Sequence, residues 1–258
     1  MKIGISTASL ARLETEDALS VLNELGAEIA EVYLKTFYEF RPEFAKKFAP
    51  RAAGVEVNSV HVNPLNFEPQ LFFRSRRERG DGFYWLDQIL RSAQLYGAKS
   101  YTFHGVVRKN GDKDGLDFIA ERLREVTDFC ARYGVKLCLE NVRWSTYDRP
   151  FIFKELKAQC PNLSGVFNIK HARKSGYPYP MYIKDMEGAI SAVHISDADA
   201  NGKTCLPGQG VYDFKEIFAR LKDAGFDGAA LIECASFKDT VELKRSVEFL
   251  KEIIHKIK

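Results

Sequence analysis

One pattern recurs along the chain and constrains its fold more than any other feature. An amphipathic stretch ends in glycine, and a short run of β-branched and apolar residues follows it. The pattern occurs at five places, around Gly26, Gly54, Gly97, Gly134 and Gly225. Glycine is favoured immediately after a helix because it adopts the left-handed backbone conformation at little steric cost. Each occurrence therefore predicts a helix followed by a β-strand.

Three further segments are typical of strands: KIGIST at the start, SGVFNI at residues 164–169 and AISAVHI at residues 189–195. They raise the number of predicted strands to eight. Strands that alternate with helices favour parallel pairing through right-handed crossovers, and the 258 residues match the size of about 250 typical of a closed barrel. We predict an α/β fold, a single-domain (β/α)8 TIM barrel spanning residues 1–258. An open doubly wound sheet is less favoured, because no glycine-rich phosphate loop follows any predicted strand.

Capping residues indicate where several helices begin. Thr15 is expected to cap the first helix, and Asp114 or Gly115 a central one. Asp213 is expected to open a later helix, and residues 239–257 are expected to form the last.

The composition limits the classes of partner. The chain carries 38 Lys and Arg against 35 Asp and Glu, and a net charge of +3 does not indicate a nucleic-acid or membrane partner. No run approaches the ~18 consecutive apolar residues of a membrane span, and the start lacks the apolar core of a secretion signal. The five cysteines have no C-x-x-C spacing, which argues against a disulfide framework or a structural zinc site. We expect a cytoplasmic protein with a small-molecule partner, and leave a homo-oligomer open.

The connection from His61 to Trp85 is unusually long for a strand-to-helix loop. It mixes phenylalanines with arginines: Phe67, Phe72, Phe73, Arg74, Arg76, Arg77 and Arg79. Such a mixture can bind single-stranded nucleic acid, or it can form a lid over a pocket with its arginines in solvent. The small net charge favours the lid.

Ionisable and amide side chains mark the ends of the last six predicted strands. In a (β/α)8 barrel, catalytic residues come from these C-terminal ends. The six strands end, in order, in His61, His104, Glu140, Asn168 with His171 close behind, His194 with Asp197 close behind, and Glu233. Four of the five histidines thus lie at one predicted rim.

A single histidine beside a strand is more often a hydrogen-bonded core residue than a ligand. Several imidazoles and two carboxylates at one barrel mouth are different, because burying them together without a cation is costly. Imidazole and carboxylate ligands suit Zn, Mn, Co or Fe, so the cluster favours a metal site. Glu140 and Glu233 are the strongest candidates, since each follows an apolar run that carries it into the interior. His61 could instead only line the pocket.

At these residues the chain resembles the xylose-isomerase-like TIM barrel superfamily. That superfamily includes sugar and sugar-phosphate isomerases and epimerases, and the endonuclease IV type of apurinic-site nuclease (AP endonuclease family 2). The resemblance covers essentially the whole chain. The segments that carry it are LCLEN, the N-I-K-H segment at residues 168–171, VHISDAD, LPGQG at residues 206–210 and LIE.

The resemblance implies a divalent-metal-dependent isomerase or epimerase that acts on a sugar or sugar phosphate. The metal would be Mn, Zn, Co or Mg. Its ligands in similar epimerases are a glutamate, an aspartate, a histidine and a second glutamate, which correspond here to Glu140, Asn168, His194 and Glu233. Asn168 stands where aspartate is usual, and a neutral amide oxygen is a weaker ligand, so we expect weaker metal binding.

The resemblance also implies a mechanism. The metal would stabilise an enediolate, while Glu140 and Glu233 act as the acid and base on opposite faces of the sugar. The substrate-binding residues would be His61, His104, His171 and Lys170. Lys170 is expected on the same side of an extended strand as Asn168.

Four more charged residues follow the predicted strand ends. Asp197 and Asp199 are candidates to orient His194, as carboxylates often do for metal-bound imidazoles. Arg143 and Arg173 could contact a phosphate or carboxylate of the substrate, although arginines in such loops are more often solvated.

Three other functions stay open. An endonuclease IV-like zinc phosphodiesterase would use His61, His104 and Glu140 for its first zinc and His171 for its third. The aspartate and histidine it also needs are replaced here by Gly202 and Thr204. A non-catalytic, metal-free sugar-binding barrel would account for Asn168. Hydrolase or lyase chemistry on a non-sugar substrate is the third, because one barrel mouth supports many reactions.

Overall fold

Eight parallel strands form a closed barrel in the computed structural model, which describes residues 1–63 and 67–257. Neighbouring strands follow one another in sequence order, and β10 closes the ring by pairing with both β1 and β7. The strands are β1 (Lys2–Ser6), β2 (Ile29–Leu34), β3 (Glu56–Val62), β4 (Ser100–Phe103), β5 (Lys136–Glu140), β6 (Ser164–Asn168), β7 (Ile190–Ile195) and β10 (Ala229–Ile232). All eight predicted strands are present, so the single-domain (β/α)8 barrel is confirmed.

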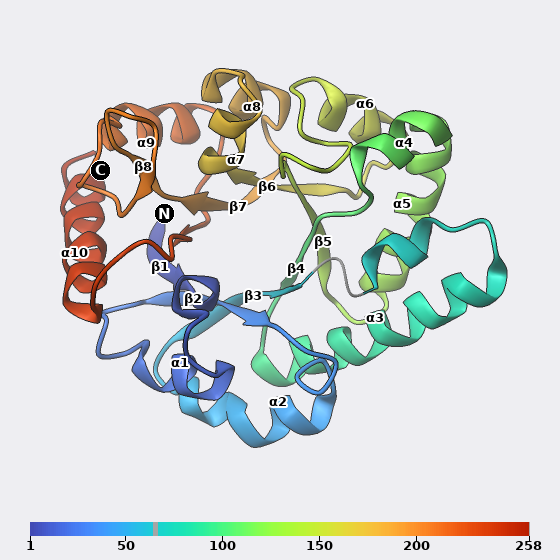
Figure 1. Ribbon diagram of the computed structural model, residues 1–258, viewed down its shortest axis with the longest axis horizontal. Coiled ribbons are helices and arrows are strands. Elements are labelled where there is room, and N and C mark those ends of the chain that lie inside the picture. The colour runs from blue at the N-terminus through green and yellow to red at the C-terminus, as the bar shows by residue number, and fades with distance from the viewer. Residues whose placement is uncertain (64–66, 258) are drawn as a thin grey trace.

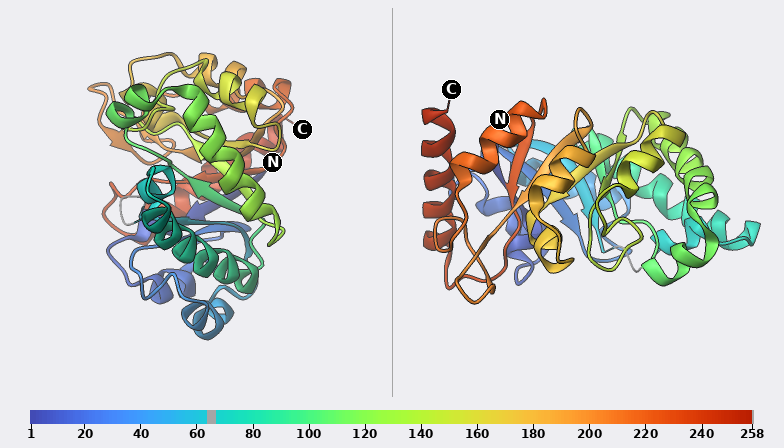
Figure 2. Two further views of the ribbon diagram at one scale, coloured as in Figure 1. Left: turned by 90° about the vertical axis from the view of Figure 1, so that its right-hand side faces the viewer. Right: turned by 90° about the horizontal axis from the view of Figure 1, so that it is seen from above.

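Helices surround the strands on all sides (Figure 1). They are α1 (Thr15–Val21), α2 (Pro42–Phe48), α3 (Arg76–Tyr96), α4 (Arg108–Asp114), α5 (Leu116–Ala131), α6 (Ile152–Gln159), α7 (Ile169–Lys174), α8 (Tyr179–Asp185), α9 (Phe214–Asp223) and α10 (Thr240–Lys256). Short 3-10 helices lie at η1 (Thr7–Leu10), η2 (Ala49–Ala52) and η4 (Glu68–Phe72). Figure 2 shows α10 on the outside of the barrel and the two chain ends on the same side of the molecule. None of the helices in residues 1–63 and 67–257 is long and apolar enough to cross a bilayer.

The five glycines of the recurring pattern behave as expected. All have positive φ, from 68° at Gly134 to 91° at Gly54. Each lies just before a strand, where the chain must reverse from a helical or turn segment. The left-handed conformation that the pattern requires is therefore present at every predicted position.

The helix starts agree with the sequence in three cases and differ in one, and α10 begins directly after its cap Asp239 as expected. Asp213 caps α9 by accepting the Glu216 N–H at 3.1 Å, and Gly115 directly precedes α5. Thr15 is not a cap, because it is the first residue inside α1. Its hydroxyl instead donates to the carboxylate of Glu39 at 3.1 Å, and Glu39 lies outside α1.

The interior of the barrel changes from apolar to polar along five of the strands, β2, β5, β6, β7 and β10. Six apolar residues, Ile29, Cys138, Val166, Ala192, Ala229 and Leu231, form a separate buried cluster. Alternate residues of a strand share one face. The positions two residues after five of these are Glu31, Glu140, Asn168, His194 and Glu233. An apolar floor therefore supports a layer of polar and ionisable side chains at the C-terminal end of the barrel.

The long connection after β3 is only partly a loop. Helix α3 starts at Arg76 and includes Arg77, Arg79 and Trp85, so this part of the expected lid is helical. Phe67 and Phe72 are buried rather than spread over a surface. Residues 64–66 of the same connection lie outside the described part of the chain.

Candidate functional site

Three side chains from three strands meet at the C-terminal mouth of the barrel. Glu140 ends β5, His194 lies near the end of β7 and Glu233 directly follows β10. Their ligand atoms all lie within 4.8 Å of one another. His194 Nδ1 is 2.7 Å from Glu140 Oε1 and 3.9 Å from Glu233 Oε2. The structure thus brings together the three residues that the strand ends suggested.

Glu140 is buried and Glu233 nearly so, but both are held in the charged form. Burial opposes their ionisation, yet the neighbouring imidazoles of His194 and His104 keep the pKa of Glu140 well below its ordinary value. For Glu233 the same burial penalty is outweighed chiefly by the Lys170 ammonium, and its pKa is also lowered. Both groups are therefore carboxylates at neutral pH.

Asn168 lies between the two carboxylates. Its Nδ2 donates to Glu140 Oε1 at 2.7 Å and to Glu233 Oε2 at 2.8 Å. Its Oδ1 accepts the backbone N–H of His171 at 3.2 Å and so caps α7. The side chain offers its amide nitrogen to the centre and uses its oxygen elsewhere. This orientation turns Oδ1 away from the two carboxylates, and the role of Asn168 as an oxygen ligand stays a prediction.

Lys170 reaches the site from a helix and not from a strand. The chain turns into α7 at Ile169, so the expected extended strand through Lys170 is wrong. The side chain nevertheless points to the centre, and its Nζ lies 2.6 Å from Glu233 Oε2. Burial disfavours the ammonium, but the Glu233 carboxylate more than compensates and raises the pKa of Lys170. Lys170 therefore stays charged beside Glu233.

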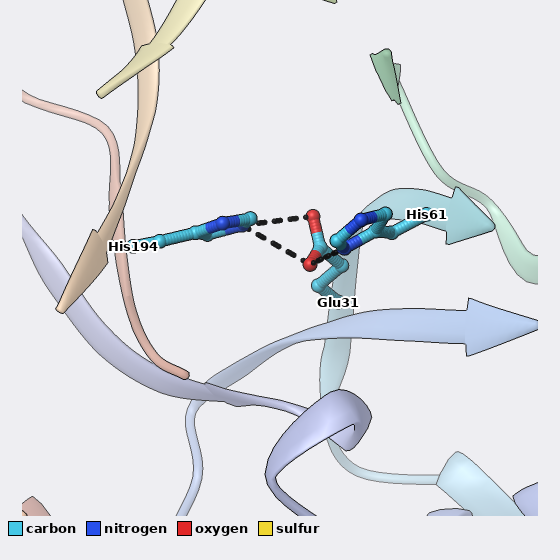
Figure 3. Close-up of side chains that lie close together, drawn as sticks. All are labelled: Glu31, His61 and His194. Carbon is cyan, nitrogen blue, oxygen red and sulfur yellow. Dashed lines mark hydrogen bonds and ion pairs between the residues drawn. The ribbon is translucent and has the colours of Figure 1, made fainter. Parts of the chain in front are cut away.

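Glu31, in β2, is the most important site residue that the sequence reasoning missed. Its side chain is completely buried between two imidazole rings, as Figure 3 shows. His61 Nδ1 lies 2.9 Å from Glu31 Oε1, and His194 Nε2 lies 3.1 Å from the same oxygen. It also accepts three hydroxyl hydrogen bonds, from Ser6, Ser59 and Thr102.

These contacts fix the state of Glu31. Burial opposes its ionisation, but His194 and His61 hold the pKa well below the ordinary value. The carboxylate orients His194 so that Nδ1 faces Glu140 and Glu233. A signal was available in the sequence, because Glu31 interrupts the apolar run of IAEVYL and has a small apolar neighbour on each side. It was overlooked because it lies within its strand and not at the end.

Asp197 does not orient His194, which corrects that expectation. Its carboxylate accepts four backbone N–H groups instead, from Ala198, Gly208, Gly210 and Tyr212. Asp199 accepts the N–H groups of Asn201 and Lys203. Both aspartates organise the loop after β7, which contains the small antiparallel hairpin of β8 (Asp197–Ala198) and β9 (Thr204–Cys205).

His61 and His104 extend the centre toward β3 and β4. Their Nε2 atoms lie 2.8 Å apart, and His104 Nε2 is also 3.2 Å from Glu140 Oε2. Glu68, from η4, approaches His104 Nδ1 at 3.3 Å and accepts its backbone N–H at 2.9 Å. Burial disfavours the imidazolium, but Glu68 and Glu140 raise the pKa of His104 to about 10. His104 is therefore positively charged next to Glu140.

Glu68 is the second residue that the sequence did not suggest. It is completely buried, and its carboxylate also accepts the Tyr101 hydroxyl at 2.6 Å and the Gly105 N–H at 3.0 Å. It comes from the connection expected to form a lid, so that segment does contribute to the barrel mouth. No local pattern distinguishes Glu68 from a solvent-exposed loop glutamate.

His171 is neutral. Burial lowers its pKa to about 4. Its Nδ1 accepts the backbone N–H of Arg143 at 3.3 Å, so the ring proton must be on Nε2. His171 can therefore donate one hydrogen bond from Nε2, as a contact to a substrate oxygen requires.

The donor set at the centre fits a divalent cation. Glu140 and Glu233 supply carboxylate oxygens and His194 supplies Nδ1, while the other nitrogen of that ring is held by Glu31. A carboxylate on the far side of the imidazole is the usual arrangement at metal-bound histidines. Two adjoining groups, Glu31–His61–His194 and His61–His104–Glu140, also have converging ligand atoms.

Residues 19–253 match the family described as the xylose isomerase-like TIM barrel. The chain belongs to this family. The match extends over most of the chain and includes every strand that contributes to the centre except β1. The resemblance noted from the strand-end motifs is therefore confirmed at the level of the family.

Two individual proteins are similar to this chain in sequence, both at low identity. An uncharacterized protein of Methanocaldococcus jannaschii is 29% identical over 148 residues, which cover 54% of this chain and 50% of that protein. The match thus spans half the length of that relative. The inosose isomerase of Bacillus licheniformis is 24% identical over 208 residues, which cover 74% of each chain.

Solved structures of the same fold align over nearly the full length. A D-tagatose 3-epimerase-like protein has a TM-score of 0.81 and 21% identity, and covers 100% of both chains. The D-psicose 3-epimerase of Clostridium cellulolyticum H10, solved with D-tagatose, has a TM-score of 0.77 and 16% identity over 98% and 99% of the chains. The IolI protein, solved with a zinc atom, has a TM-score of 0.75 and 17% identity over 100% and 98%. At these identities the likeness establishes the fold.

Proposed function

We propose that this protein is a divalent-metal-dependent isomerase or epimerase of a sugar or sugar phosphate. The observation that carries the proposal is the convergence of Glu140, His194 Nδ1 and Glu233 at the C-terminal mouth of the barrel. The inosose isomerase relative and the sugar epimerases of the same fold support the reaction class.

In this proposal Glu140, His194 and Glu233 hold the metal ion, which would be Mn, Zn, Co or Mg. Asn168 would become a fourth ligand only if its amide turned over and gave up the cap on α7. A bound divalent ion would polarise a carbonyl and its neighbouring hydroxyl, which lowers the cost of forming an enediolate.

Glu233 is the better placed of the two carboxylates to remove a proton. Its Oε2 is occupied by Lys170 and Asn168, while its Oε1 has no hydrogen-bond donor among the described residues. Its side chain is 13% exposed, whereas that of Glu140 is 1% exposed. Glu233 would take the proton from the carbon next to the carbonyl, and Glu140 would return one on the opposite face.

The surrounding side chains would hold the substrate. His171 would donate from Nε2 to a substrate oxygen, and the Lys170 ammonium would offset the negative charge of the enediolate. His104, charged through Glu68 and Glu140, and His61 would complete the wall of the pocket on the β3 and β4 side.

The test is solvent deuterium uptake into a panel of ketoses and their phosphates, measured by NMR with the protein loaded with Mn, Co, Zn or Mg. We expect uptake next to the carbonyl of at least one sugar, reduced about 100-fold or more by Glu140→Gln and by Glu233→Gln. Glu248→Gln, an exposed glutamate of α10, is the matched control and should retain full activity. Exchange that survives both active-site substitutions would refute the assigned roles.

Two further measurements test two of the alternatives, the metal-free sugar-binding barrel and the zinc phosphodiesterase. Metal analysis of the purified protein, with thermal stability before and after adding Mn, Co or Zn, tests the metal site. No bound ion and no stabilisation would favour a metal-free sugar-binding barrel. Cleavage of abasic-site DNA would instead favour the phosphodiesterase, whose first zinc would require His61, His104 and Glu140.

A further inference from the structure

A cavity of about 490 Å³ opens beside Glu233. Its walls come from α7, from the β8–β9 hairpin and from the residues that follow β10. Four positive side chains line it: Lys170, Arg173 and Lys174 from α7, and Lys203 from the hairpin. Glu233 is the only acidic residue among the lining residues, and it is already bound to Lys170. The cavity is therefore strongly basic although the chain as a whole is nearly neutral.

Lys170 is paired with Glu233, whereas the other three positive charges are not neutralised by an ion pair. Within residues 1–63 and 67–257, no carboxylate forms an ion pair with Arg173, Lys174 or Lys203. Partial burial, followed by repulsion from Lys170, Arg173 and Arg143, lowers the pKa of Lys174. Like charges gathered around one cavity disfavour the folded state unless an anion binds between them.

Arg173 is fixed in place by the hairpin. One guanidinium nitrogen donates to the backbone carbonyl of Gly202, and the other donates to the Thr204 hydroxyl at 3.3 Å. These partners are neutral, so they orient the guanidinium without cancelling its charge. The guanidinium also donates to the Tyr212 hydroxyl, which is a further neutral partner. A guanidinium held in this way is suited to a planar or tetrahedral anion.

We propose that this cavity binds an anionic group of the substrate, so that the sugar carries a phosphate ester or a carboxylate. This inference rests on the proposed function, because the cavity shares Glu233 and Lys170 with the candidate centre. Its place also fits, since phosphate sites in (β/α)8 barrels are frequently built from the loops after the seventh and eighth strands. A phosphate suits the three cations other than Lys170 better than a single carboxylate charge does.

The two lysines that make no side-chain contact to the candidate centre allow a clean test. The double variant Lys174→Gln and Lys203→Gln removes two charges from the cavity. The double variant Lys184→Gln and Lys215→Gln removes two charges from exposed positions of α8 and α9 and serves as the control. Both double variants lower the net charge by the same amount. A difference in anion binding between them is therefore due to the charges at the cavity and not to the net charge of the protein.

Binding is measured first with inorganic phosphate as the probe, by calorimetry and thermal stabilisation. We expect phosphate to bind the natural protein and the control alike, and to bind the cavity variant about tenfold or more weakly. Equal phosphate binding by the natural protein and both double variants would overturn the inference. This measurement needs no turnover, so it stays valid if the proposed isomerase activity is absent.

Substrate preference is measured next, with a neutral ketose, its phosphate ester and a sugar acid of similar length in the deuterium assay. We expect kcat/KM to be higher for an anionic sugar than for the neutral one. The ratio of these two kcat/KM values should fall about tenfold or more in the cavity variant and stay unchanged in the control. Preference for the phosphate or for the acid identifies the anion. Exchange of the neutral ketose at equal or higher kcat/KM would overturn the inference and leave the proposed function standing. Phosphate binding that depends on the cavity, without exchange of any sugar, would refute the isomerase and retain the anion site.

Discussion

Asn168 illustrates how a single side chain decides the state of the centre. It donates one hydrogen bond to Glu140 and one to Glu233. Two carboxylates so close together repel each other, and the amide protons relieve part of that repulsion. Asn168 therefore takes over, in the protein without metal, part of the role that a cation would have between these oxygens.

The variant Asn168→Asp tests this role. It replaces two donors by a third buried carboxylate, so we expect the EDTA-treated protein to lose about 3 kcal/mol of stability. A divalent ion gains a charged ligand in place of an amide, so added Mn should raise the melting temperature more in the variant than in the natural protein. Thermal denaturation in EDTA and in Mn measures both effects.

Asn141→Asp is the control for this experiment. Asn141 is buried next to the site and exchanges two hydrogen bonds with the Asn168 backbone. Its substitution should destabilise the protein equally in EDTA and in Mn. If the two aspartate variants respond to Mn in the same way, the centre does not bind the ion between Glu140 and Glu233.

At the scale of elements, the loop after β7 has an unusual internal anchor. The Asp197 carboxylate accepts four backbone N–H groups and is almost fully buried. A Cβ at Gly210 would lie 2.3 Å from Asp197 Oδ1, so only glycine allows this close approach. The same loop includes the hairpin that fixes Arg173 and contributes Lys203 to the basic cavity.

Asp197→Ala should therefore loosen the whole loop. It leaves four backbone donors without their acceptor, and we expect a loss of about 2–4 kcal/mol in the free energy of unfolding. Urea denaturation measures the loss, and limited proteolysis should show cleavage within residues 199–212. Asp199→Ala removes only two exposed hydrogen bonds and should cost about 1 kcal/mol or less. Equal losses for the two variants would show that Asp197 is not the anchor.

At the scale of the whole molecule, barrel closure gathers ionisable groups from most of the strands into one buried network. The Glu31 and His194 side chains meet although they are 163 residues apart in the sequence. Within this network His104 has a pKa raised to about 10, and that of His194 is raised well above its ordinary value. The folded protein thus keeps protons that the unfolded chain releases above its histidine pKa of ~6.5.

Below pH ~6.5 the folded and the unfolded protein both carry the His104 proton, and the stabilisation that the charged imidazole gives is fully present. Between pH ~6.5 and about 10 this stabilisation is lost as the pH rises. We expect the free energy of unfolding of EDTA-treated protein to fall over this range. His104→Gln should reduce the slope by up to about 1.4 kcal/mol per pH unit.

Urea denaturation at several pH values measures that slope. His255→Gln is the matched control, because His255 is exposed on α10 and far from the network in the fold. It should keep the slope of the natural protein. A slope unchanged by His104→Gln would show that His104 does not retain its proton in the folded state.

The sequence by itself determined the eight strands, their order and the residues at their ends. These features are local: glycine after a helix, β-branched runs, and polar side chains such as His61, Glu140 and Glu233 directly after apolar ones. Because all strands of a (β/α)8 barrel run in one direction, their ends must meet, and the composition of the mouth could be predicted.

Only the tertiary structure decided which atoms face each other there. The orientation of the Asn168 amide depends on a helix that starts one residue later, and Glu31 and Glu68 reach the histidines only because the barrel closes and η4 folds inward. The basic cavity likewise joins α7, the hairpin and the end of β10, which are distant in sequence. Hydrogen bonds and ion pairs depend on distances of a few ångströms between atoms. The sequence pattern gives no such distances for residues that are far apart along the chain.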